Sequence, residues 1–188
     1  MVTIRNETCR DIEAREQLLE GVWGLSRFEK TAERLREGRS PAAGLSLIAE
    51  QDGNVVGTVR LWHVCAGPGR PALLLGPLAV DEAWRNRGIG GALMRRALGA
   101  AGRRGHDALL LVGDAPYYQR FGFSAAKTGA LWLPGPFERQ RLLGCELKTG
   151  SLDGARGLIS ATGRSLRKPG FTTLVAGSAA SSAARHAA

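Results

Sequence analysis

The sequence predicts an α/β fold built from alternating strands and helices. Apolar segments of strand length occupy residues 45–50, 55–64, 72–80 and 107–113. The first two flank Gln51-Asp52-Gly53-Asn54, a turn sequence typical of a β-hairpin. Between the last two, Ile89, Leu93, Ala97 and Leu98 recur at helical spacing, which indicates an amphipathic helix.

The other elements follow from the same patterns of apolar residues. In the N-terminal part we expect a strand over 2–5, a helix over 11–22 whose first turn Asp11 caps or charges, and a second short helix over 28–36. The second helix is expected to end before Gly38 and Pro41. In the C-terminal part we expect a strand over 130–133 and a closing strand over 140–148. Beyond residue 149 the pattern supports at most a short helix and a strand.

Length and composition indicate one domain with a substantial core. The chain has 188 residues, of which 44% are hydrophobic and 23% charged. No apolar run reaches the roughly 20 residues that a membrane-spanning helix needs, and the N-terminus has no secretory pattern. Cys9, Cys65 and Cys145 are scattered without metal-binding spacing. We therefore expect reduced thiols in a cytoplasmic protein with no metal and no membrane partner.

The chain is strongly basic, with a formal net charge of +9 and a pI near 10.5. Several arginines fall on the face of the predicted helix opposite its apolar residues, namely Arg95, Arg96, Arg103 and Arg104. This pattern is typical of a solvated helix face, and it also favours a polyanionic ligand. The sequence contains no recognition helix, RNP-like strand or zinc spacing, so nucleic acid is not an expected partner.

A glycine-rich basic turn stands between the strand over 72–80 and the helix. It reads Trp84-Arg85-Asn86-Arg87-Gly88-Ile89-Gly90-Gly91. A helix start offers unpaired backbone N–H groups and a positive dipole end, and glycines let the backbone close around a bulky anion. Arginine adds fork-shaped donors that suit phosphate oxygens. The turn predicts a pyrophosphate site, although it matches neither the Rossmann nor the P-loop pattern.

Two motifs together narrow this prediction. Arg85-x-x-Gly88-x-Gly90 resembles the pyrophosphate-binding loop of the GNAT superfamily of N-acetyltransferases, and Tyr118-x-x-x-Gly122-Phe123 resembles a later element of the same superfamily. The resemblance covers residues 2–148. The family pattern usually places an asparagine upstream of the tyrosine, whereas this chain reads Leu111-Val-Gly-Asp-Ala-Pro there. The segment after residue 149 is similar to that of a YhbS-like bacterial subgroup.

The resemblance implies a central, twisted, mixed but mostly antiparallel sheet of six or seven strands, flanked by helices. The sheet would part at the cofactor strand, consistent with the interruption Gly76-Pro77. It implies acetyl-CoA as the acyl donor and an amine as the acceptor. The cofactor-binding residues would be Leu78, Ala79, Val80, Arg85, Asn86, Arg87, Gly88, Ile89, Gly90 and Gly91.

The same resemblance implies that Tyr118 is the catalytic general acid, which returns a proton to the departing thiolate. Neighbouring side chains on a short helix point about 100° apart, so we expect only Tyr118, and not Tyr117, to face the thiol. The candidates for a base are Glu50, His63, Asp81 and Asp114, and none is selected. His63 alternates with Val59 and Leu61 and is expected in the core. Trp23, Phe28, Trp62, Trp132 and Phe137 are candidate pocket walls or core residues.

The predicted organisation is an acetyltransferase-like domain over 1–148, a C-terminal extension packed on it over 149–175, and a disordered tail over 176–188. The predicted activity is acetyl transfer to a primary amine of a small molecule or peptide by direct attack. An alternative of a different class is a non-catalytic acyl-CoA-binding sensor with the same fold. A monomer and a homodimer are both compatible with the sequence.

Overall fold

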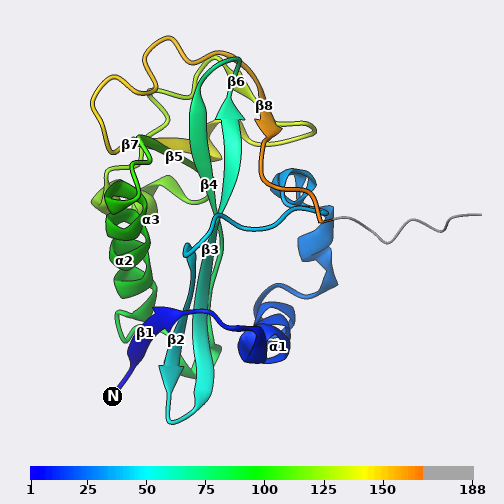
Figure 1. Ribbon diagram of the computed structural model, residues 1–188, viewed down its shortest axis with the longest axis vertical. Helices are drawn as coiled ribbons and strands as arrows, with labels where there is room; N and C mark the ends of the chain where they lie inside the picture. The colour runs from blue at the N-terminus through cyan, green and yellow to red at the C-terminus, as the bar shows by residue number, and fades with distance from the viewer. Residues whose placement is uncertain (167–188) are drawn as a thin grey trace, which may run out of the picture.

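The computed structural model describes residues 1–166, which form a mixed eight-stranded sheet flanked by helices (Figure 1). Six strands follow one another in the order β1-β2-β3-β4-β5-β7, and β8 pairs with both β3 and β6. All neighbouring pairs are antiparallel except β4–β5 and β6–β8. The strands are β1 (Thr3–Asn6), β2 (Ser46–Gln51), β3 (Asn54–Ala66), β4 (Pro71–Val80), β5 (Ala108–Val112), β6 (Leu131–Trp132), β7 (Leu142–Glu146) and β8 (Gly157–Ala161).

Helices cover both faces of the sheet. The longest, α2 (Ile89–Arg103), lies on one face, and α1 (Ile12–Trp23) lies on the other (Figure 1). Short 3-10 turns and one short helix complete the fold: η1 (Cys9–Asp11), η2 (Leu25–Glu29), η3 (Thr31–Leu35), η4 (Glu82–Trp84), α3 (Ala115–Tyr118), η5 (Gln119–Phe121) and η6 (Arg139–Arg141). Within residues 1–166, no helix combines the length and the apolar character that crossing a membrane requires.

The predicted hairpin joins β2 to β3. Asp52 and Gly53 both have positive φ, 51° and 80°, as a tight two-residue hairpin turn requires. Gln51 pairs with Asn54 directly across this turn. The turn sequence therefore identifies both the connection and its register.

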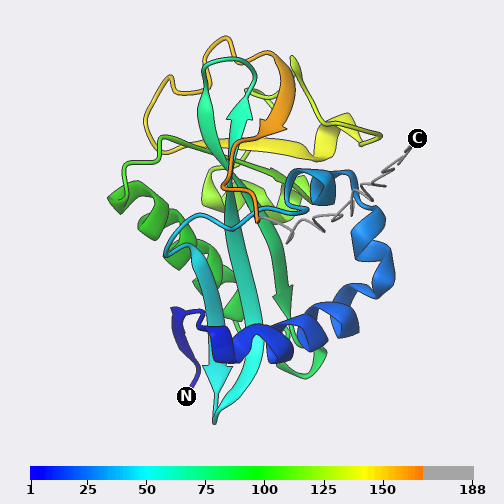
Figure 2. The same cartoon turned by 45° about the vertical axis from the view of Figure 1, so that its right-hand side comes forward.

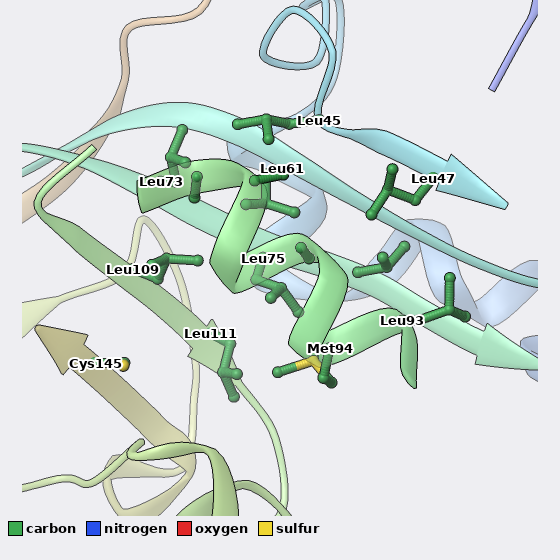
Figure 3. Close-up of a cluster of buried hydrophobic side chains, with 14 of the residues drawn as sticks. Leu45, Leu47, Leu61, Leu73, Leu75, Leu93, Met94, Leu109, Leu111 and Cys145 are labelled. Carbon is green, nitrogen blue, oxygen red and sulfur yellow. The ribbon is translucent and has the colours of Figure 1, made fainter. Parts of the chain in front are cut away.

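The main core lies between α2 and the sheet (Figure 3). The apolar face of α2 presents Leu93, Met94 and Ala97, all fully buried, to leucines from β2, β3, β4 and β5. Gly57 on β3 lets the helix approach, since a Cβ there would lie 3.1 Å from Leu93 Cδ1. The predicted solvated face is confirmed, because Arg95, Arg96, Arg103 and Arg104 are all exposed.

A second apolar cluster forms on the opposite side, around Trp62, Leu74 and Leu110. Leu152 and Ile159, from the segment after β7, are buried in it. Strand β8 also pairs with the end of β3, from Val64 to Ala66. The sheet therefore has eight strands rather than six or seven, because β6 and β8 extend it. Residues 149–156 form turns and no helix.

The sheet parts between β4 and β5, as predicted. These parallel strands are paired only at Leu73–Leu109 and Leu74–Leu110, and the remainder of β4 has no partner on that side within residues 1–166. Gly76-Pro77, a cis peptide, coincides with a shift in the β3–β4 register between Val59 and Leu61. A proline in this position removes a ladder donor and suits such an irregularity.

The expectation of one helix over 28–36 was wrong. The chain instead forms η2 and η3, separated by Lys30, whose backbone is extended (φ −65°, ψ 132°). Leu35 is the one buried apolar side chain of these two turns, so little packing is available to hold a continuous helix. Figure 2 shows this segment rising from α1 beside the sheet toward the loop that follows β6. There Arg34 Nη1 donates to Pro134 O at 2.7 Å.

Candidate active site

The glycine-rich turn leads directly into α2, as the sequence predicts. Gly88 occupies the N-cap with left-handed backbone angles (φ 78°, ψ 0°), a conformation that glycine adopts most readily. Ala92 is the first residue whose N–H is bonded within this turn, to Gly88 O at 3.0 Å. Across the described residues, no backbone carbonyl accepts from the N–H groups of residues 86–91. These donors and the dipole of a 15-residue helix form an anion cradle.

The two arginines of the turn are exposed, and their side chains make few contacts. Arg85 Nη1 lies 3.6 Å from Glu82 Oε1, and the Arg87 guanidinium stacks 4.7 Å from the centre of the Trp84 ring. Neither contact consumes the full set of donors that a guanidinium carries. Both side chains are thus able to bind an anion at the start of α2.

The unpaired edge of β4 adds further donors. Asp81 N–H donates to Val56 O on β3 at 3.0 Å, and backbone groups alternate in direction along an antiparallel strand. Ala79 therefore faces β3, where it pairs with Thr58. The backbone N–H groups of Leu78 and Val80 consequently face the opposite edge, where the pairing with β5 has already ended.

Tyr118 ends α3, just beyond β5, and its ring is largely buried. The ring packs edge-on to Phe123, with centroids 6.1 Å apart. Gly113 provides the space, since a Cβ there would lie 2.3 Å from Tyr118 Cε2. Burial, reinforced by Tyr117, raises the pKa of the Tyr118 phenol to about 12. The hydroxyl is therefore protonated at every physiological pH.

Tyr117 also lines the cavity, and which of the two tyrosines faces the thiol stays a prediction. Its hydroxyl lies over Gly90 in the first turn of α2, 2.8 Å from where a Cβ would stand. The two tyrosine rings meet edge to face at 4.9 Å. Because α3 is only four residues long, both side chains reach the same opening from its end.

One cavity of about 1050 Å³ connects these features. Six of the predicted site residues line it: Leu78, Ala79, Val80, Arg85, Gly90 and Tyr118. The remaining five, Asn86, Arg87, Gly88, Ile89 and Gly91, belong to the adjoining turn and helix start but are not part of its lining. Among them Ile89 is buried in the core.

Of the candidate bases, only Asp114 lines this cavity. Glu50 pairs with Arg5, with Oε2 2.6 Å from Nη2, and the Asp81 carboxylate caps η4 through Ala83 N–H. His63 is half-buried rather than in the core, and its ring centre lies 5.4 Å from that of His106. The other three candidates do not line this cavity.

Sequence reasoning missed the charged wall of the cavity. Lys30 and Arg36, from the segment around η3, and Arg141, which precedes β7, line the end away from α2. No motif marks them, because they come together only through the fold. Of the aromatic candidates, Trp23 and Phe137 line the cavity, Phe28 and Trp132 are exposed, and Trp62 is buried. Leu111, in the position of the missing asparagine, is also buried.

The comparisons with known proteins agree with this geometry. Residues 42–125 match the model of the acetyltransferase (GNAT) domain. The chain is 29% identical over 157 residues to YhbS of Escherichia coli, described as an uncharacterized N-acetyltransferase, covering 83% of this chain and 93% of YhbS. It is 30% identical over 131 residues to YjhQ of the same organism, also an uncharacterized N-acetyltransferase, with 68% of each chain covered. The chain belongs to the GNAT family of N-acetyltransferases.

Two solved structures place the fold in the same family. The crystal structure of E. coli YhbS in complex with CoA superposes with a TM-score of 0.73 and 28% identity, covering 85% of this chain and 89% of YhbS. A GNAT acetyltransferase from Brucella melitensis in complex with acetyl-CoA gives a TM-score of 0.57 and 28% identity, covering 81% and 99%. YhbS is thus similar to this chain both in sequence and in fold, over most of the length of each protein.

Proposed function

We propose that this protein transfers an acetyl group from acetyl-CoA to a primary amine of a small molecule or peptide, with Tyr118 as general acid. One observation carries the proposal: a single cavity is lined by Arg85 and Gly90 at the anion cradle, by the unpaired edge of β4, and by Tyr118. Acyl transfer from a thioester needs an anchor for the donor, a donor group at the carbonyl oxygen, and a proton for the leaving thiolate. The groups that meet these three requirements line one cavity.

The residues present suit a CoA molecule. The donor set at the start of α2 consists of backbone N–H groups without backbone acceptors among residues 1–166, joined by Arg85 and Arg87, which is the chemistry that a pyrophosphate requires. The open edge of β4 can pair with the amide groups of an extended chain laid beside it. A cavity of about 1050 Å³ lies at the upper end of the range for small-molecule sites. When bound, acetyl-CoA supplies the acetyl thioester.

Each of the groups in this site then has a separate role in the reaction. Tyr118 holds a proton on Oη and donates it to the sulfur that leaves, because a phenol with a pKa of about 12 is fully protonated at neutral pH. The N–H of Leu78 or Val80 polarises the carbonyl oxygen as a single-donor oxyanion site. Asp114, exposed at the start of α3, attracts the acceptor amine. No single residue needs to act as base, since the cavity is open to water.

We also propose a cytoplasmic location. All three cysteines fall within residues 1–166 and are free thiols there, which suits a reducing compartment. Cys145 is buried, and burial raises the pKa of its thiol. It is therefore suited to packing rather than to nucleophilic chemistry.

The competing function is an acyl-CoA sensor that binds without turnover. A thiol-release assay with acetyl-CoA and a panel of primary amines separates the two, with mass spectrometry to identify an acetylated product. An enzyme gives amine-dependent release of CoA with matching product, and Tyr118→Phe lowers the rate. Binding of acetyl-CoA without amine-dependent release across the panel would favour the sensor.

A further inference from the structure

The end of the cavity opposite the anion cradle contains a buried arginine whose charge is only partly compensated. Arg36 follows η3 and is 9% exposed. Its Nη2 pairs with Glu33 Oε2 at 2.8 Å, and Glu33 is itself partly exposed to solvent. Arg36 Nε is buried and has no hydrogen-bond partner among the described residues. A buried guanidinium with idle donors is costly unless a ligand completes its contacts.

The guanidinium of Arg36 lies against β4 in the wall of the cavity. Its Nη1 lies 3.6 Å from the Cβ position of Gly76, at the bend of β4, and both residues line the cavity. Arg36 thus forms the wall next to the stretch of β4 that lacks a β5 partner. The Arg36 guanidinium lines the same cavity as Tyr118, although the two residues lie far apart in the sequence.

Two further cations surround this end of the cavity. Lys30 has no carboxylate within 4.0 Å among residues 1–166, and its ammonium stacks 3.6 Å from the centre of the Trp23 ring. Arg141 holds only a loose contact of 3.9 Å with Glu138. Both Arg36 and Arg141 lower the pKa of Lys30, after burial as the main cause. Arg27 and Arg34 also line this end, so five cations stand against the three carboxylates Glu29, Glu33 and Glu138. The excess of positive charge favours an anion in the cavity.

The carboxylates of the cavity fall into two groups. Glu29, Glu33 and Glu138 line the same end as the cations, where Glu33 pairs with Arg36 and Glu138 lies near Arg141. Asp114 is exposed beside Tyr118 and raises its pKa in part. Asp114 thus suits an ammonium beside Tyr118. Arg141 lies near both Tyr118 and the cations around Arg36, since it lowers the pKa of Tyr118 as well as that of Lys30. This arrangement suits a molecule with an amine at one end and an acid at the other.

We propose that the acceptor amine carries an acidic group, a carboxylate or phosphate, that binds Arg36 in the wall of the cavity, with Lys30 and Arg141 beside it. This inference rests on the proposed function for the identity of the reacting end. The guanidinium fork of Arg36 accommodates two oxygens of either anion. The bound acidic group limits the length of the acceptor and orients it. Its amine then points toward Asp114 and Tyr118.

The test uses the full chain saturated with CoA, so that the cradle at α2 is filled. Arginine Nε–H signals are followed by ¹H–¹⁵N NMR during titration with inorganic phosphate, and the Arg36 signal is assigned by its loss in Arg36→Lys. We expect a saturable shift of the Arg36 signal. Lys30→Gln and Arg141→Gln weaken the apparent affinity by roughly tenfold or more, and Glu33→Gln strengthens it by freeing Arg36. Arg96→Gln, which removes an exposed charge on α2, leaves it unchanged.

A second set of titrations identifies the acidic group of the acceptor. β-Alanine is compared with neutral β-alaninamide, and phosphoethanolamine with ethanolamine, in the same titration. A shift with the acid but not with its neutral partner supports the proposal and shows which anion is preferred. A purely structural Arg36 gives no saturable shift with phosphate or with either acid, and that result overturns it. Binding of CoA is measured first in each sample, so loss of CoA binding counts against the proposed function and leaves the anion site to be judged separately.

Discussion

The ring of Tyr118 lies so close over Gly113 that no side chain fits at position 113. A Cβ there would lie 2.3 Å from Tyr118 Cε2 and 2.9 Å from Cδ2, well inside van der Waals contact. Gly113 N–H also donates to Arg141 O at 2.9 Å, which fixes the backbone beneath the ring. The glycine therefore sets the position of the tyrosine hydroxyl in the cavity.

Gly113→Ala is expected to displace the Tyr118 ring and to lower kcat for acetyl transfer by roughly 10- to 100-fold, since a shift of about 1 Å in a catalytic group costs on that order. Affinity for acetyl-CoA should change little. Gly129→Ala is the matched control, because a Cβ at that exposed position meets nothing within 4 Å. Wild-type kcat in a folded Gly113→Ala protein would contradict this role.

Tyr118→Phe removes the proposed proton donor and keeps the packing against Phe123. We expect kcat to fall by about 10²- to 10⁴-fold, the usual contribution of general acid catalysis, with calorimetric affinity for CoA unchanged. Tyr117→Phe should lower kcat much less, because the Tyr117 hydroxyl lies over Gly90 rather than at the reacting end. Equal losses in the two variants would show that the assignment to Tyr118 is wrong.

The raised pKa of Tyr118 makes a prediction about stability at high pH. Its folded pKa of about 12 exceeds the ordinary value of about 10, so its stabilising contribution is complete below pH 10 and is lost as the pH rises from about 10 through 12. Urea unfolding across this range should show wild type losing stability relative to Tyr118→Phe. Parallel curves for the two proteins would mean that the phenol is not buried.

Asp11 makes the opposite prediction at low pH. Its carboxylate accepts from Arg5 Nη1 and Nη2 at 2.8 and 2.9 Å and from Thr8 N–H at 2.7 Å, and the bond to Arg5 is the main reason that its pKa is well below the usual range. Asp11→Asn should cost about 1 kcal/mol at pH 7, as for a lost cap. Because a lowered pKa stabilises the fold only above the unfolded value, this gap should close as the pH falls below about 4.

The bend of β4 depends on a buried hydrogen bond from Trp62 Nε1 to Gly76 O, 2.6 Å long. Trp62→Phe leaves that carbonyl without its partner, so we expect a loss of about 1–3 kcal/mol in the free energy of unfolding. The KM for acetyl-CoA should rise as well, since the bend precedes the open edge at Leu78 and Val80. Thermal and urea unfolding measure the first effect and steady-state kinetics the second.

Local signals account for most of the fold and for the cofactor end of the site. The hairpin at Asp52-Gly53, the glycine turn before α2 and the interruption at Gly76-Pro77 each depend on backbone preferences of a few adjacent residues. Such preferences are readable without knowing the rest of the chain. The GNAT resemblance then supplies the order in which these elements are assembled.

The other end of the cavity depends on contacts between distant segments. Arg36 and Arg141 are brought together by folding, and β8 joins β3 through a pairing of Cys65 with Ser160, which no local pattern encodes. The residue spacing around Lys30 allows one helix, but the segment has too little apolar surface to pack as one. The division into a domain over 1–148 and an extension over 149–175 stays a prediction, and residues 167–188, with the proposed tail, lie outside the described residues.

Whether the turn before α2 holds the cofactor is measured by calorimetric binding of acetyl-CoA to wild type, Gly88→Glu and Gly69→Glu. Gly88 and Gly69 both have positive φ, 78° and 70°, and a Cβ at either meets nothing within 4 Å, so the two variants share the same backbone strain and added charge. We expect wild type and Gly69→Glu to bind acetyl-CoA, and Gly88→Glu, with a carboxylate in the cradle, not to bind it. Equal binding by all three folded proteins, or binding by none, would contradict this expectation.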